Sequence, residues 1–236
     1  MSNKVFGIFK GIGLDLLNLF YPATCCGCGE ALIKGESQLC LSCIAALPRT
    51  HFHDMEENTI ETRFFGKVKM EYATSFLHFE KKTITQRLLH EIKYDGKKEL
   101  GKMLGCFFGN ELKESRLNNI DIIIPVPLHP NKLKSRGYNQ SEWIAMGISE
   151  TMGKPLISDA LIREVETNTQ TKKNAFERWE NVDGIFRVAL PEKVKGKHAL
   201  IIDDVVTTGS TIEACATELL KIDGTTVSAA ALAAAE

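Results

Sequence analysis

The sequence predicts an α/β fold, in which helices flank a parallel sheet and a small cysteine-rich unit precedes it. From position 121 onward, short apolar runs typical of buried strands alternate with helical patterns. Two of these runs, 122–126 and 199–202, are apolar throughout, as strands covered on both faces are. The third observation is a set of paired cysteines near the N-terminus. A chain of 236 residues has room for one to two domains.

Three segments are expected to precede the larger domain. Residues 1–20 have the pattern of an amphipathic helix, and residues 21–50 form a cysteine-rich finger that is too short for a core of its own. Residues 51–63 are polar and acidic, which favours an exposed connector. The larger α/β domain is expected to cover residues 64–236.

Within that domain, the spacing of apolar residues predicts the order of the elements. They are a strand or hairpin at 68–79, a helix at 83–114 that breaks near Asp95, a strand at 122–126, a helix at 139–152, strands at 161–165 and 185–188 around a long loop, a strand at 199–202, a helix at 211–222 and a last strand at 225–232. Sheets of this kind bind ligands at the carboxyl ends of their strands.

Composition and charge exclude several classes of protein. Hydrophobic residues make up 44% and charged residues 25%, which excludes a mostly disordered chain. The formal net charge of -1 excludes a general attraction to nucleic acid, so DNA binding would need a local basic patch. Lys10 and Asp15 interrupt the apolar stretch at 5–20, and no signal-peptide cleavage site follows it. We therefore expect a cytoplasmic protein without a membrane span.

The paired cysteines have the spacing of a structural zinc site. Two residues separate the members of each pair, Cys25 with Cys28 and Cys40 with Cys43. Four thiolates complete a tetrahedral shell, which suits structural Zn²⁺ rather than catalysis. Cys26 is an alternative first ligand, although the matching spacing of the second pair favours Cys25. The nearby His51 and His53 are interpreted as connector residues, because the cysteines already complete the shell.

The segment 199–211 carries the strongest functional signal. An apolar strand ends at Asp203 and Asp204, and a hydroxyl-rich turn with a helix follows. Backbone N–H groups and hydroxyls in such a turn bind phosphate at a helix N-terminus, and Gly209 permits close approach. The carboxylates can accept hydrogen bonds from ribose hydroxyls. In the alternative reading, the acids only cap a loop and Ser210 or Thr211 caps the helix.

This segment resembles the signature with which type I phosphoribosyltransferases bind 5-phosphoribosyl-1-pyrophosphate (PRPP). The resemblance implies that the two carboxylates hold the ribose, that the turn holds the 5-phosphate, and that Mg²⁺ accompanies the pyrophosphate. The residues implied to bind PRPP are Asp203, Asp204, Val205, Val206, Thr207, Thr208, Gly209, Ser210 and Thr211.

The resemblance extends along the chain to the ComF family. The similar parts are the four-cysteine finger and the segments 124–130, 136–142, Arg163, 169–171 and 178–186. It implies a phosphoribosyltransferase-like protein of DNA uptake and natural transformation, with PRPP, single-stranded DNA and the DNA-uptake machinery as partners. The alternative is an active phosphoribosyltransferase that uses a small-molecule base or amine in nucleotide metabolism. No segment identifies an acceptor or a catalytic residue.

Three further groups of residues are candidates for phosphate or DNA contacts. The loop after the strand at 122–126 is expected to hold pyrophosphate through Pro127, Leu128, Lys132 and Arg136. Residues 166–184 have the length of a lid. A basic stretch is the candidate DNA surface, with Phe64, Phe65 and Tyr94 as stacking rings; its members are Lys81, Lys82, Arg87, Lys93, Lys97, Lys98 and Lys102.

Overall fold

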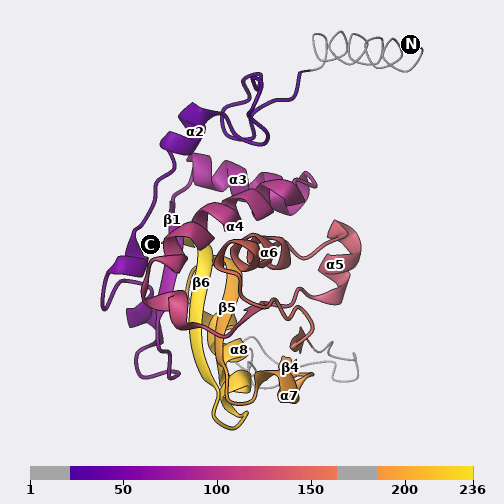
Figure 1. Cartoon of the computed structure of the whole chain (residues 1–236). Helices are drawn as coiled ribbons and strands as arrows, with labels where there is room; N and C mark the ends of the chain where they lie inside the picture. The colour runs from indigo at the N-terminus through magenta and orange to yellow at the C-terminus, as the bar shows by residue number, and fades with distance from the viewer. Residues whose placement is uncertain (1–21, 164–184, 236) are drawn as a thin grey trace, which may run out of the picture. The chain divides into compact units, whose positions relative to one another are not determined.

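The structure is a computed structural model that describes residues 22–163 and 185–235 (Figure 1). The expected N-terminal helix at 1–20 and the expected lid at 166–184 fall outside these residues. The chain divides after Leu47 into two compact units, the cysteine-rich unit and a larger unit that begins at Pro48. Among the described residues, no helix combines the length and the hydropathy that a bilayer crossing needs.

The cysteine-rich unit is built mainly from turns. A bridge joins Thr24 to Ala31 on either side of the first cysteine pair. The short helix α2 (Leu41–Ala45) contains Cys43 of the second pair, and Cys40 is its N-cap. The Glu36 carboxylate accepts hydrogen bonds from the Ile33 and Leu41 N–H groups, at 2.9 and 2.8 Å, and so closes the loop between the pairs.

The larger unit contains a four-stranded parallel sheet, which confirms the predicted fold class. Its strands lie in the order β1-β6-β5-β2. All three pairings are parallel. The strands are β1 (Ala73–Phe79), β2 (Ile122–Pro125), β5 (His198–Val206) and β6 (Thr226–Ala235). The sequence patterns predicted an earlier start for β1, at residue 68, and an earlier end for β6, at residue 232.

Helices cover the sheet. The expected break at Asp95 separates α3 (Ile84–Tyr94) from α4 (Lys98–Lys113). Helix α6 (Gln140–Met152) packs on β2 and β5. Helix α8 (Ser210–Leu220) joins a core that contains Ile124 and Ile201. Because side chains alternate along a strand, Ile123 and Leu200 face the other side of the sheet, where α4 and α6 lie (Figure 1).

Helices α4 and α6 approach each other through glycines. A Cβ on Gly105 would lie 2.2 Å from the Ile144 carbonyl oxygen, and one on Gly147 would lie 2.1 Å from the Lys102 carbonyl oxygen. Both contacts are with backbone, so no side chain can move to make room. The two helices therefore pack at a distance that only glycine permits.

The expectation of an exposed connector at 51–63 is wrong. This segment forms the 3-10 helix η1 (Phe52–Asp54) and leads into η2 (Glu61–Phe64), with Phe52, Ile60 and Phe64 buried. Its polar residues conceal this burial in the sequence, because several of them bond to the backbone rather than to water.

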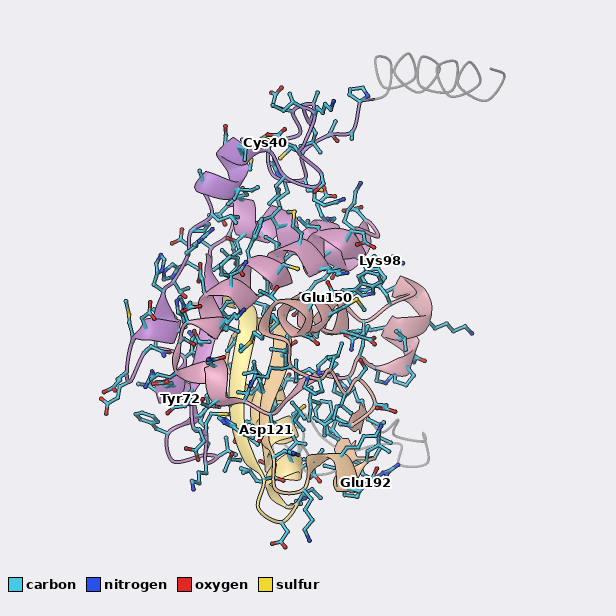
Figure 2. All side chains as sticks on the ribbon, in the orientation of Figure 1. Cys40, Tyr72, Lys98, Asp121, Glu150 and Glu192 are labelled. Atoms are coloured by element: carbon cyan, nitrogen blue, oxygen red, sulfur yellow. The ribbon has the colours of Figure 1, made fainter. Side chains whose placement is uncertain are left out.

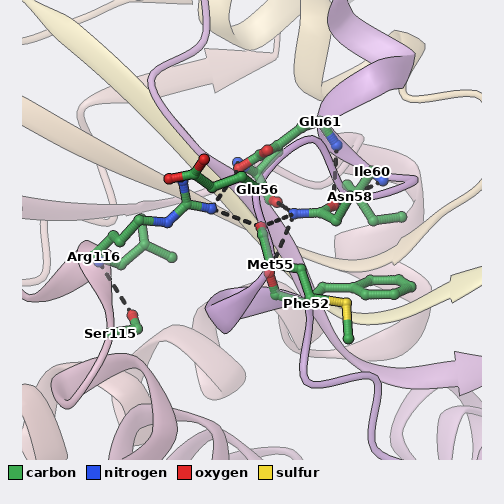
Figure 3. A network of polar contacts seen from close by, with 10 residues as sticks. Phe52, Met55, Glu56, Asn58, Ile60, Glu61, Ser115 and Arg116 are labelled. Carbon is green, nitrogen blue, oxygen red and sulfur yellow. Dashed lines mark hydrogen bonds and ion pairs between the residues drawn. The ribbon is translucent and has the colours of Figure 1, made fainter.

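Asn58 is the centre of that segment (Figure 3). Its Nδ2 donates to the carbonyls of Phe52, Met55 and Ala73, at 3.2, 3.3 and 2.9 Å. Its Oδ1 accepts from the Ile60 and Glu61 N–H groups.

Arg116 fixes the same segment from η3 (Arg116–Asn119). It donates to the Met55 carbonyl at 2.7 Å and to Glu61 Oε1 at 3.3 Å (Figure 3). The guanidinium also lies 4.7 Å from the centre of the Tyr72 ring. Residues 51–64 are thus part of the folded unit.

The remaining elements differ from the expectations in detail. Strands β3 (Leu161–Arg163) and β4 (Phe186–Val188) form their own antiparallel pair outside the main sheet. Helix α5 (Pro130–Arg136) replaces the loop expected after β2, and the short helix α7 (Pro191–Val194) precedes β5. None of the α5 side chains is buried, so this helix has no apolar periodicity to reveal it.

Candidate functional site

Strand β5 carries the acidic pair to the carboxyl edge of the sheet. The sequence pattern predicted that the strand ends at the two acids, but the strand continues beyond them, because Val205 and Val206 pair with Ala233 and Ala234 of β6. Helix α8 then begins after Gly209, its N-cap, which has φ 85° and makes no side-chain cap. The alternative in which Ser210 or Thr211 caps this helix is therefore wrong.

The two carboxylates have different partners. Asp203 Oδ1 accepts hydrogen bonds from Ser141 Oγ at 3.2 Å and from the Asp204 N–H at 2.8 Å. Asp204 Oδ2 lies 2.9 Å from Lys93 Nζ, at the end of α3. The sequence analysis assigned Lys93 to a DNA-binding surface, but the structure directs its ammonium group into the acidic pair.

The surroundings of Asp203 favour its protonated form. Burial and the adjacent charge of Asp204 raise the pKa of Asp203 from 3.8 to about 7, although hydrogen bonds and the Lys93 charge oppose this. Burial raises the pKa because a carboxylate is solvated poorly there. The pair can therefore gain or lose a proton near neutral pH.

A small hollow lies beside the acidic pair, in the turn between β5 and α8. It is open to solvent and is lined by Asp203 and residues 205–212. All residues implied to bind PRPP, except Asp204, line it. Thr208 Oγ1 and Ser210 Oγ lie 2.9 Å apart at its rim.

Residues from η2 support this turn. Arg63 donates to the carbonyls of Val206 and Thr207, and to the Ala235 carbonyl at the end of β6. The Phe64 ring packs against Gly209, where a Cβ would lie 3.0 Å from the ring. Phe64 is 1% exposed, so the expectation that it offers a stacking surface is wrong. Sequence reasoning missed both supports because they act across a large separation in the chain.

The residues predicted to hold pyrophosphate do not form one loop. Pro127 and Leu128 lie between β2 and α5, after Val126, whose N–H donates to the Ile202 carbonyl at 2.9 Å, next to the acidic pair. Lys132 is exposed on α5. Arg136 ends that helix, donates to Gln140 Oε1 and lies 5.4 Å from the centre of the Tyr94 ring.

The basic stretch at 81–102 is partly used inside the protein. Besides Lys93, Lys102 pairs with Glu150 at 2.8 Å, and Lys98 Nζ lies 4.6 Å from the centre of the Trp143 ring. Lys98 and Glu150 are on neighbouring helices (Figure 2). Tyr94 remains 69% exposed at the end of α3.

The cysteine-rich unit brings its two cysteine pairs together. The sulfur atoms of Cys25, Cys28, Cys40 and Cys43 lie within 4.8 Å of one another, and those of Cys28 and Cys40 are 3.8 Å apart. Ligands bound to tetrahedral zinc at about 2.3 Å lie about 3.8 Å from each other. Cys26 is outside this group, with its sulfur 3.9 Å from Gln38 Oε1. These four cysteines could hold a metal ion.

The pKa of the first of these thiols, Cys25, is lowered, which favours its thiolate form. Burial opposes ionisation of Cys25, but backbone hydrogen bonds from Cys40, Cys28 and Gly27 outweigh it and lower its pKa to about 6. The Cys25 sulfur accepts from the Cys40 and Gly27 N–H groups at 3.2 and 3.3 Å. The thiolate is the form that binds metals.

Comparisons with known proteins agree with this fold. Residues 139–236 match the phosphoribosyl transferase domain family. DNA utilization protein YhgH of Escherichia coli O157:H7 is 35% identical over 144 residues, which cover 59% of this chain and 63% of that protein. Competence protein F of Haemophilus influenzae is 26% identical over 140 residues, covering 59% of this chain and 61% of that protein. The chain thus spans less than two thirds of these relatives.

Two solved structures illustrate the structural likenesses. A glutamine PRPP amidotransferase from B. subtilis, complexed with ADP and GMP, has 22% identity and a TM-score of 0.40 over 61% of this chain and 30% of its own. A hypoxanthine phosphoribosyltransferase from Staphylococcus aureus has 12% identity and a TM-score of 0.36 over 57% of this chain and 63% of its own.

Three findings agree on the family: the parallel sheet, the matched domain and the named homologues. The larger unit has the type I phosphoribosyltransferase fold. Together with the homologous DNA utilization and competence proteins, this domain supports the assignment of the chain to the ComF family.

Proposed function

We propose that this protein binds PRPP with Mg²⁺ and acts in DNA uptake and natural transformation through single-stranded DNA, in the cytoplasm. The observation that carries the first part is the hollow at the N-terminus of α8, which adjoins the buried acids Asp203 and Asp204. A helix N-terminus with hydroxyl groups around it is an anion site. Two adjacent carboxylates supply acceptors for the hydroxyl groups of the same ligand.

In this proposal each part of the site has one role. The turn at 207–211 binds the 5-phosphate through N–H and hydroxyl groups. Asp203 and Asp204 accept hydrogen bonds from the ribose hydroxyl groups, and Pro127 and Leu128 lie beside the pyrophosphate. Mg²⁺ would neutralise charge on the pyrophosphate, mostly through its waters. Lys93 keeps the charge of Asp204 compensated until the ligand arrives.

The binding test is calorimetry with PRPP and Mg²⁺. We expect the double variant Asp203→Asn and Asp204→Asn to bind at least about tenfold more weakly, because hydrogen bonds to charged acceptors contribute about 1.5–3 kcal/mol each. Asp121→Asn is the matched control, since that carboxylate bonds to the His198 N–H at the other end of β5. Equal affinity of the double variant and the wild type would remove the ribose assignment.

The DNA part of the proposal is supported by the exposed end of α3. Tyr94 is 69% exposed, and it stands next to Lys93, which reaches the acidic pair. A base can stack on such a ring while nearby lysines contact phosphates. Residues Lys81, Lys82 and Lys97 of the basic stretch are exposed.

Fluorescence anisotropy with a labelled oligonucleotide tests this binding across a salt series. Binding should weaken steeply with salt, and also in Tyr94→Ala and in Lys81→Glu with Lys97→Glu, because counterion release drives phosphate contacts. Met55→Ala removes an exposed apolar side chain outside the candidate surface, 48% exposed, and serves as control. Absence of binding at low salt would refute the DNA proposal. Release of pyrophosphate with a base or amine would instead favour the alternative, an active transferase.

The four cysteines are proposed to hold one structural Zn²⁺. The spacing of the four sulfur atoms supports this assignment. Elemental analysis should find that Cys40→Ser with Cys43→Ser loses one zinc per chain, while the control Cys26→Ser keeps it. Loss of zinc in the control would make Cys26 a ligand, and zinc that persists in the double variant would refute the site.

A further inference from the structure

A second group of potential metal ligands lies at the start of the larger unit, outside the sites already described. His51, His53 and Asp54 each offer one ligand atom, and these atoms lie within 4.8 Å of one another. His53 and Asp54 belong to η1, and His51 immediately precedes it. The His53 side chain is 6% exposed, whereas His51 and Asp54 face solvent.

Both ring nitrogens of His53 face carboxylate oxygens, so the neutral ring can donate to only one of them. His53 Nδ1 lies 3.5 Å from Glu111 Oε2, and neither buried atom has a hydrogen-bond partner among the described residues. A carboxylate oxygen only accepts, so Nδ1 must carry the proton in order to satisfy it. In a neutral ring, Nε2 then presents a lone pair, and it lies 3.2 Å from another acceptor, Asp54 Oδ2. Only a proton or a metal ion between them makes this contact favourable.

The distances at this group fit a metal ion. Nitrogen and oxygen ligands bound to tetrahedral zinc at about 2.0–2.1 Å lie about 3.3 Å apart, close to the observed distance between Nε2 and Oδ2. A proton between Nε2 and Oδ2 would not account for the third ligand atom, which His51 places within 4.8 Å of the other two. The centres of the His51 and His53 rings lie 6.0 Å apart.

The surrounding residues complete a familiar arrangement for metal-bound histidine. A histidine that binds metal through one nitrogen usually donates its other N–H to a carboxylate, which orients the ring. Glu111 of α4 occupies that place for His53. Arg49 in turn fixes Glu111, with Nη1 2.9 Å from Oε1.

We propose that His51, His53 and Asp54 bind a divalent transition-metal ion. Two imidazoles and one carboxylate suit Zn²⁺ best among the common ions. The three ligands leave one position for water on the solvent side. This site is separate from the cysteines and from the proposed PRPP pocket, and it would hold η1 to α4 through the contact between His53 and Glu111.

Metal counting on the full chain tests the proposal. After saturation with Zn²⁺ and removal of excess, the wild type should hold one more ion than His51→Gly. Glycine suits the positive φ at this position, so the variant removes a ligand without disturbing the fold. His90→Ala is the matched control, because His90 also contacts an aspartate, Asp95 at 3.0 Å, and the part of the chain that the structure describes places no third His, Cys, Asp or Glu ligand atom with this pair.

Cobalt separates this site from the cysteine site. Co²⁺ bound by thiolates gives a charge-transfer band that nitrogen and oxygen ligands do not give. We expect His51→Gly and His53→Gln to lose one cobalt without losing this band, and Cys40→Ser with Cys43→Ser to lose the band but keep the other cobalt. Metal should also raise the melting temperature of that cysteine variant. Equal metal content in His51→Gly and wild type would overturn the proposal.

Discussion

The ammonium group of Lys93 lies 2.9 Å from Asp204 Oδ2, and the two side chains are only 21% and 6% exposed. This ion pair joins the end of α3 to the acidic pair on β5. A ligand that uses Asp204 must therefore share the carboxylate with Lys93 or displace it. The ion pair therefore links α3 to this edge of the sheet, and it would compete with any ligand that bonds to Asp204.

Replacement of Lys93 by methionine should lower the free energy of unfolding by about 3 kcal/mol, because Asp204 is left buried without a compensating charge. Urea denaturation of Lys93→Met measures the loss. The double variant with Asp204→Asn should recover most of it. Lys102→Met is the control, since its partner Glu150 is 54% exposed and this surface pair should matter little. A full and additive loss in the double variant would contradict the coupling.

The stability of the protein should depend on the ionisation of Asp203. Its pKa is raised from 3.8 to about 7, so between these pH values the folded state binds a proton that the unfolded state has lost. Its contribution to stability is therefore greatest below pH 4, declines by up to about 1.4 kcal/mol per pH unit, and levels off above pH 7.

Asp203→Asn removes this titration. The stability of the variant relative to the wild type should rise from pH 4 to pH 7 and then stay constant, as measured by urea denaturation at several pH values. A difference that is flat across this range would mean that Asp203 is ionised in the folded protein at low pH as well.

The close approach of α4 and α6 should make Gly105 intolerant of any side chain. Gly105→Ala places a Cβ 2.2 Å from a backbone oxygen, so the helices must separate, and we expect a loss of about 3 kcal/mol or more. Gly101→Ala is the matched control on the same helix. Its Cβ would meet only side chains at 3.6 Å or beyond, so it should be neutral or stabilise by up to about 1 kcal/mol. Thermal unfolding of both variants checks the contrast.

Loss of the Asn58 side chain should release residues 51–64. Asn58→Ala leaves buried backbone groups of η1, η2 and β1 without partners, so we expect a loss of about 2–3 kcal/mol. Thr62→Ala is the control, because its hydroxyl makes one exposed bond, to the Thr59 carbonyl. Hydrogen exchange should show faster exchange of the Ile60 and Glu61 amides in Asn58→Ala alone. Unchanged exchange would show that other contacts hold the segment.

The sequence was most informative where chemistry and local order coincide. The parallel sheet, the break at Asp95, and the grouping of Cys25 with the other three cysteines were predicted, because each leaves a short-range pattern. The order of strand, acids, turn and helix around Asp203 was predicted too, although the strand proved to be longer. The residues that bind PRPP remain a prediction.

The parts that escaped prediction depend on contacts between distant segments. Nothing near Lys93 in the chain indicates that it faces Asp204, and nothing near Arg63 indicates that it bonds to the turn at Thr207. Helix α5 did have local signals, with Pro130 at its first position and Gly137 after its last. Because α5 has no buried face, its sequence has no apolar periodicity between these two end signals, and the helix was not predicted.

The position of β6 has a consequence for the order in which the protein can fold. This strand lies between β1 and β5, yet it is the last of the described strands to be synthesised. Until residues 226–235 leave the ribosome, β1 has no neighbour in the sheet and β5 has one open edge. Unpaired apolar strand edges in a nascent chain are prone to aggregate. We therefore expect the larger unit to fold only after translation of β6, and to need protection by a chaperone until then.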